Sequence, residues 1–125
     1  KTPLVPEKLL SLVENSLNDD KAEKTVVIDL VGKTALTDYV VIASGTSQRH
    51  VGAMADHLRK KIKSNGIKGV SIEGHGQCDW VLIDAGDVII HLFRPEVREF
   101  YNIEKMWRVH TIDDAIDVEN KVFIS

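Results

Sequence analysis

The chain has 125 residues, of which 43% are hydrophobic, so it has the size of one domain and enough apolar side chains to form a core. Its net charge of −3 and its pI of about 5.9 argue against binding nucleic acid mainly by neutralising phosphates. This acidic balance fits a basic protein partner better. No apolar run approaches the ~20 residues of a membrane span, and residues 1–22 contain no apolar segment of the kind found in signal peptides.

The first part of the chain predicts a helix followed by two strands. Residues 6–18 form an amphipathic pattern that starts at a proline and repeats leucine and valine at helical spacing. Residues 25–31 (TVVIDLV) predict a strand. Residues 39–43 (YVVIA) predict a second strand that is apolar throughout, so we expect it to lie inside the sheet.

The rest of the chain predicts a helix, a short strand, a β-hairpin and a last helix. A second amphipathic pattern covers about residues 47–65, and residues 70–73 predict a short strand. The hairpin is expected over residues 78–93, and a helix is expected to run from Pro95 to about Trp107. This order of elements indicates an α/β domain with a mixed β-sheet flanked by helices.

The hairpin is apolar on both of its faces. If Ala85-Gly86 is the loop, Leu82 lies opposite Ile89 and Trp80 lies opposite His91. Because strand side chains alternate between faces, one face carries Val81, Ile83, Val88, Ile90 and Leu92, and the other carries Trp80, Leu82, Ile89, His91 and Phe93. The first set is a plausible core face. The second must be covered by the helix after Pro95 or by another molecule.

The segment Gly45-Thr46-Ser47 precedes the second helix, where free amides and the helix dipole favour a phosphate. Nucleotidyltransferases use such a helix start together with two carboxylates two residues apart on a strand, which hold Mg²⁺. The acidic pair with this spacing is Asp117/Glu119, which lies near the chain end. The favoured interpretation is therefore a tight turn in which Thr46 or Ser47 caps a helix.

Other candidate chemistry is also incomplete. The side chains of His75, Cys78 and His91 could bind a soft metal ion, but a stable metal site usually needs three or four ligands close together. A Ser/His/Asp triad can be written from Ser44, Ser47, His50 and Asp56, but no G-x-S-x-G motif is present. We therefore predict no metal site and no hydrolytic triad. Basic residues cluster around the end of the predicted helix over residues 47–65, namely Arg59, Lys60, Lys61, Lys63 and Lys68. We interpret them as a solvated helix face with cations near its C-terminus.

Three blocks of the sequence together resemble a known family. They are SGTSQRHV at residues 44–51, DWVLIDAGDV at residues 79–88 and REFYNIEKMW at residues 98–107. This run is similar to the ribosomal silencing factor family, RsfS, also called Iojap, over about residues 7–107. Ile103 stands where leucine is more often expected. We therefore predict a domain over residues 1–107 and a tail of open role over residues 108–125.

The resemblance implies a nucleotidyltransferase-like core that lacks the catalytic carboxylates, and therefore a protein with no enzymatic activity and no cofactor. It also implies that the chain binds the large ribosomal subunit through ribosomal protein L-fourteen. Bound there, family members block joining of the small subunit and repress translation, notably when nutrients are scarce. We expect a bacterial cytoplasmic protein rather than an organellar one, because no transit segment is visible. The single cysteine, Cys78, agrees with a reducing compartment.

The resemblance assigns Trp80 to the partner contact, because this residue is the tryptophan of the DWVLID block. The alternation of the hairpin adds neighbours on the same face, and Glu73 is a further candidate near its rim. The predicted partner-binding residues are therefore Trp80, Leu82, Asp84, Ile89, His91, Phe93 and Glu73. Two alternatives remain at this point, namely a nucleotide-binding domain and a homodimer formed through the same apolar face.

Overall fold

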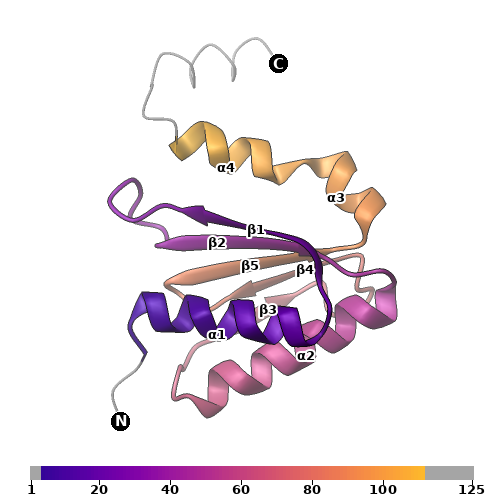
Figure 1. Ribbon diagram of the computed structural model, residues 1–125, viewed down its shortest axis with the longest axis horizontal. Coiled ribbons are helices and arrows are strands. Elements are labelled where there is room, and N and C mark those ends of the chain that lie inside the picture. The colour runs from indigo at the N-terminus through magenta and orange to yellow at the C-terminus, as the bar shows by residue number, and fades with distance from the viewer. Residues whose placement is uncertain (1–3, 112–125) are drawn as a thin grey trace.

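The computed structural model describes residues 4–111, and it describes side chains as far as Trp107. This part of the chain contains both helices and strands, and Figure 1 shows their arrangement. In chain order they are α1 (Pro6–Asp19), β1 (Glu23–Asp29), β2 (Tyr39–Ser44), α2 (Gln48–Ser64), β3 (Ser71–Glu73), β4 (Trp80–Asp84), β5 (Val88–Phe93), α3 (Pro95–Tyr101) and α4 (Ile103–Thr111).

The strands form one mixed sheet in the order β1-β2-β5-β4-β3. Strands β2 and β5 are parallel, whereas the other neighbours are antiparallel. Helices α1 and α2 lie against one face of the sheet, and α3 and α4 lie on the other (Figure 1). The predicted α/β architecture with a mixed sheet flanked by helices is confirmed.

The main core lies between the sheet and the helices α1 and α2. Alternate residues of β4 and β5 point into it, and all five that the alternation assigned to a core face are completely buried, namely Val81, Ile83, Val88, Ile90 and Leu92. The helices contribute their predicted apolar stripes, including Leu9, Val13, Val51 and Leu58. Ser47 caps α2, because its Oγ accepts a hydrogen bond from the backbone N–H of His50 at 3.1 Å.

The register of the hairpin differs from the prediction by two residues. Trp80 pairs with Phe93 and Leu82 pairs with His91, so Gly86-Asp87 forms the loop in place of Ala85-Gly86. Gly86 has a φ of 86°, which a loop of this kind requires at its first position, and its N–H donates to Asp84 Oδ1 at 2.9 Å. A shift of two residues leaves every side chain on its predicted face, because the strand period is two.

The last predicted helix is in fact two helices. The prediction of one helix from Pro95 to Trp107 is wrong, because Asn102 adopts a left-handed conformation with a φ of 47° between α3 and α4. Asparagine tolerates this conformation better than most residues. Arg98 then fixes both helices to the sheet, since its guanidinium donates to Ser44 on β2 at 2.9 Å and to Glu104 on α4 at 2.7 Å.

Smaller differences concern strand ends and the tail. β1 covers Glu23–Asp29 rather than residues 25–31, and it contains an irregularity where Lys24 has a φ of 50°. α4 continues to Thr111, past about residue 107, where the last helix was predicted to end. The acidic segment 113–120 lies outside the described residues.

The two faces of the hairpin should respond differently to the same substitution. We expect Ile83→Ala, which removes a completely buried side chain, to lower the free energy of unfolding by about 3–4 kcal/mol. Ile89→Ala removes a partly exposed side chain on the other face and should cost about 1 kcal/mol. Urea denaturation followed by circular dichroism measures both. Equal losses would contradict the assignment of the main core to one face.

Candidate functional site

The register of the sheet places all seven predicted partner-binding residues on the face that also carries α3 and α4, called here the second face. Glu73 pairs with Leu82, which pairs with His91 on the next strand. Asp84 pairs with Ile89, and Trp80 pairs with Phe93. These pairs occupy alternate positions along the strands, so their side chains share one side of the sheet.

The second face is only partly covered by helices. A second apolar cluster joins β1, β2 and β5 to α4 and contains Ile28, Leu30, Val40, Ile42, Phe93 and Ile103. Trp80 and Ile89 are half-buried at the border of this cluster, and half-buried Leu82 belongs to neither apolar cluster. The helices therefore account for the β1 side of this face, and they leave the β4 side accessible.

Two of the seven residues offer little surface of their own. Phe93 has no exposed surface and His91 is 7% exposed, so both lie beneath the accessible part of the second face. Glu73 and Asp84 are exposed at its rim. We call the accessible set the β4 patch, and it consists of Trp80, Leu82, Ile89, Glu73 and Asp84.

The orientation of Trp80 is fixed by a hydrogen bond and by ring contacts. Its Nε1–H donates to Nδ1 of His91 at 3.0 Å. The Trp80 ring also lies 4.9 Å from the ring centroid of Phe93 and 4.9 Å from that of Tyr101. Such contacts add to the area that an aromatic side chain buries. One edge of the indole is thus held inside the protein, while part of the side chain remains accessible.

Burial determines the charge of His91. It lowers the pKa of His91 from 6.5 to about 4, so the ring is neutral at pH 7. Neutral imidazole can accept the hydrogen bond from Trp80 at Nδ1, so the ring carries its own proton on Nε2. His91 is thus a buried acceptor for Trp80 rather than a surface cation.

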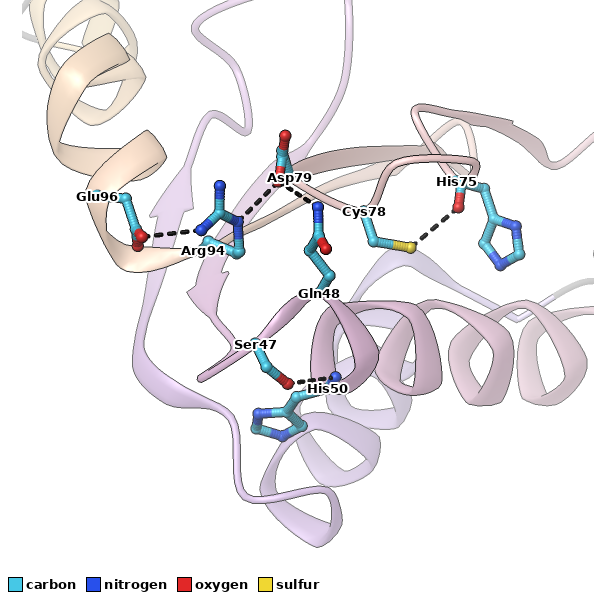
Figure 2. Close-up of polar contacts among 8 residues, drawn as sticks. All are labelled: Ser47, Gln48, His50, His75, Cys78, Asp79, Arg94 and Glu96. Carbon is cyan, nitrogen blue, oxygen red and sulfur yellow. Dashed lines mark hydrogen bonds and ion pairs between the residues drawn. The ribbon is translucent and has the colours of Figure 1, made fainter.

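A polar network adjoins the β4 patch (Figure 2). Oδ1 of Asp79 accepts hydrogen bonds from Gln48 Nε2 at 3.0 Å and from Arg94 Nε at 2.7 Å, and Arg94 also pairs with Glu96 at 2.8 Å. The bond from Gln48 and then that from Arg94 lower the pKa of Asp79. This network joins the start of α2, the start of β4 and the start of α3.

The sequence analysis did not find this network, although a signal for it exists. The pairing of Trp80 with Phe93 continues outward to Asp79 and Arg94, where the Arg94 N–H donates to the Asp79 carbonyl at 3.1 Å. The predicted register placed Asp79 opposite Leu92. The error of two residues therefore concealed the ion pair.

The turn at Gly45-Thr46-Ser47 is occupied by contacts within the chain. The Thr46 N–H donates to His50 Nδ1 at 2.9 Å, and the Gly45 N–H donates to the Phe93 carbonyl at 2.9 Å. A Cβ at Gly45 would lie within 2.9 Å of side-chain atoms of Met54 and Val51, so the glycine permits close packing of α2. Helix capping and packing thus explain this motif. Asp117 and Glu119 lie outside the described residues.

The residues considered for a triad or a metal site have other partners. Ser44 accepts from Arg98, Asp56 pairs with His75 at 2.8 Å, and His50 Nε2 bonds to the Asp20 carbonyl at 2.7 Å. The Cys78 thiol bonds to the carbonyl of His75, as Figure 2 shows. Among the side chains that the structure describes, which extend to Trp107, no three from His, Cys, Asp or Glu are grouped as metal ligands. No helix within residues 4–111 is long and apolar enough to cross a membrane.

Comparisons with known proteins identify the family of this chain. Residues 3–123 match the family model described as ribosomal silencing factor during starvation. The chain belongs to the ribosomal silencing factor RsfS family. It is 55% identical to the RsfS of Zymomonas mobilis, over 86% of this chain and 80% of that protein. The family match extends beyond Trp107, where the resemblance based on motifs ended.

Two further relatives inform the fold and the role. A crystal structure of a Chromobacterium violaceum protein superposes with a TM-score of 0.79 at 36% identity, over 83% of this chain and 87% of that one. The mouse protein named mitochondrial assembly of ribosomal large subunit protein 1 is 37% identical over 86% of this chain, which covers 48% of the mouse protein. Family membership supports a ribosome-associated role in translational silencing, which is regulatory.

The buried state of His91 predicts how stability depends on pH. Between pH 6.5 and 4 the unfolded chain takes up a proton at this position that the folded chain does not. The free energy of unfolding should therefore fall as the pH drops through this window, by up to roughly 3 kcal/mol from this residue. Urea denaturation at several pH values measures the slope.

The variant His91→Gln should show a shallower slope in the same window, because it removes the titrating group. Ile89→Ala is the matched control, since it lowers stability beside His91 without removing a titratable group. The free energy of unfolding of Ile89→Ala should be lower at every pH, but it should change with pH as steeply as that of the wild type. Identical slopes in the wild type and His91→Gln would contradict a buried neutral histidine.

Proposed function

We propose that this chain represses translation by binding the large ribosomal subunit through ribosomal protein L-fourteen and by blocking the small subunit from joining. The family supports the ribosome-associated part of this proposal, and the name of the mouse relative refers to the large subunit. The proposed contact surface is the β4 patch. The setting is the bacterial cytoplasm, where both ribosomal subunits are present.

The observation that carries the proposal is that Trp80 is only half-buried while its orientation is fixed against the sheet. Trp80, Leu82 and Ile89 offer apolar surface, and the second apolar cluster supports them from the β1 side. Aromatic anchors surrounded by weaker contacts provide most of the affinity in many interfaces. The carboxylates of Glu73 and Asp84 at the rim favour a basic partner and increase the rate of encounter.

The proposed roles of His91 and Phe93 follow from their burial. Neither presents much surface to a partner, so we assign them to holding Trp80 in its binding orientation. The predicted direct contacts are then Trp80, Leu82, Ile89, Asp84 and Glu73. His91 and Phe93 remain part of the site as positioning residues.

The proposed mechanism is steric and requires neither catalysis nor a cofactor. A typical interface buries ~1,600 Å² in total, which the β4 patch and its surroundings can supply. A folded domain of 14.0 kDa at the joining surface then occupies space that the small subunit needs. The same apolar patch can form a homodimer in the free protein, and such a dimer would compete with binding to the ribosome.

Substitutions in the β4 patch should weaken binding to isolated large subunits in a co-sedimentation assay. Trp80→Ala removes the anchor and should cost at least ~2 kcal/mol, which is about 30-fold in affinity. Leu82→Ala should cost ~1 kcal/mol or more, because this side chain is accessible and lies in neither apolar cluster.

Leu36→Ala is the matched control, because Leu36 is 73% exposed and lies outside the β4 patch, in the segment between β1 and β2. It should bind as the wild type does. Circular dichroism establishes that each variant is folded, and light scattering gives its oligomeric state. Wild-type affinity in folded Trp80→Ala and Leu82→Ala would refute the patch assignment.

The steric mechanism has its own test. Added in excess to large subunits, the wild type should prevent formation of complete ribosomes on addition of small subunits, as measured in sucrose gradients. Leu82→Ala should lose this effect in proportion to its affinity. Calorimetric titration with ATP, GTP and CTP in the presence of Mg²⁺ should give no saturable heat, and a clear isotherm would favour a nucleotide-binding function.

A further inference from the structure

A hollow of about 460 Å³ lies next to Trp80, at the end of the β4 patch. Its walls come from the loop before β4, from the start of β4 and from α3. The residues that line it are Gly74, Gly76, Gln77, Asp79, Trp80, Val97 and Tyr101. Gly74 has a φ of 82°, and a Cβ there would lie 2.1 Å from the Trp80 carbonyl oxygen, so this wall of the hollow requires a residue without a side chain.

Two aromatic rings form one side of the hollow. The centroids of Trp80 and Tyr101 are 4.9 Å apart, and their planes are inclined by 44°. Tyr101 is the last residue of α3, and it is 53% exposed. Faces of such rings carry partial negative charge and attract cations.

A carboxylate with unused acceptor capacity contributes to the same hollow. Both hydrogen bonds to Asp79, from Gln48 and from Arg94, go to Oδ1. Figure 2 shows the other carboxylate oxygen pointing away from both donors, and no described side chain bonds to it. The side-chain bonds keep the pKa of Asp79 low, so this oxygen carries negative charge at neutral pH.

The adjoining charges leave the hollow acidic. Arg94 lies between Asp79 and Glu96, so two carboxylates share one guanidinium and the group has a net charge of −1. Arg94 is 29% exposed, and its Nε and one terminal nitrogen are directed at these two partners. Negative charge next to two aromatic rings favours binding of a cation that is planar and weakly hydrated.

We infer that this hollow receives an arginine side chain of the basic protein partner. The guanidinium stacks on Trp80 and Tyr101 and donates to the free oxygen of Asp79, a combination that the planar fork of arginine satisfies better than lysine. This inference rests on the proposed function for the identity of the partner. It adds a subsite outside the seven residues that the sequence predicted, formed by Asp79 and Tyr101.

The first test uses a small probe and does not depend on the ribosome. A peptide, acetyl-Gly-Arg-Gly-amide, is titrated into ¹⁵N-labelled protein, and the indole N–H signal of Trp80 is followed, with Trp107→Phe used to assign it. The signal should shift to saturation at millimolar peptide. The same peptide with citrulline, which has the shape of arginine without its charge, should bind at least ~fivefold more weakly.

Two variants test the wall residues in the same titration. Asp79→Asn keeps an oxygen for Gln48 and Arg94 but loses the charge, and Tyr101→Leu removes an exposed ring without opening the core. Each should weaken peptide binding by at least about threefold. Leu36→Ala, at a residue that is 73% exposed and does not line the hollow, should leave the affinity for the peptide unchanged.

The second test measures affinity for isolated large subunits. Asp79→Asn and Tyr101→Leu should each reduce it by about fivefold or more, and Leu36→Ala should not. If the wild-type protein binds the arginine peptide but not the large subunits, the proposed function is wrong while the arginine site is still supported. The arginine site would be overturned if the indole N–H signal of Trp80 did not shift with the arginine peptide, or shifted equally with the citrulline peptide. It would also be overturned if Asp79→Asn and Tyr101→Leu both bound large subunits with the affinity of the wild type.

Discussion

The pairing of β4 with β5 is the constraint on which the candidate site depends. It places Trp80 beside Phe93 and Leu82 beside His91, and its continuation brings Asp79 to Arg94. It also directs Ile83 and Ile90 into the main core. A slip of one residue would exchange the two faces, so burial of five apolar side chains under α1 and α2 fixes the composition of the opposite face as well.

The two faces of the sheet are covered to different extents, and this asymmetry creates the site. Two long helices cover most of the first face, whereas the helix break at Asn102 divides the cover of the second face into two short helices. Arg98 holds them over β2 and β1. The apolar residues of β4 that face this side consequently keep accessible surface, although they are as hydrophobic as those in the core.

The sequence predicted the fold better than the details of the site, for identifiable reasons. The faces of the hairpin were correct despite a wrong register, because an error of two residues preserves the alternation. The loop was misplaced because Ala85-Gly86 and Gly86-Asp87 are both plausible turns, and the bond from Gly86 to Asp84 decides between them. The helix break was missed because the apolar pattern continues across Asn102 and a single backbone angle interrupts it.

Burial of polar residues was the least predictable property. His91 occupies an alternate position that sequence alone assigns to a surface, yet neighbouring side chains cover it, and the ion pair of Asp79 with Arg94 depends on the register. Both are tertiary effects. Neither leaves a periodic pattern in the sequence.

The hydrogen bond from Trp80 to His91 explains why a histidine under an apolar patch is compatible with binding. If docking removed water from an indole N–H that had no other acceptor, the complex would lose a free energy comparable to one hydrogen bond. In this chain the N–H already has its acceptor inside the protein, at 3.0 Å. A partner can therefore cover the tryptophan ring without leaving its N–H unpaired. The apolar area buried in this way contributes to affinity, and little desolvation of polar groups offsets that contribution.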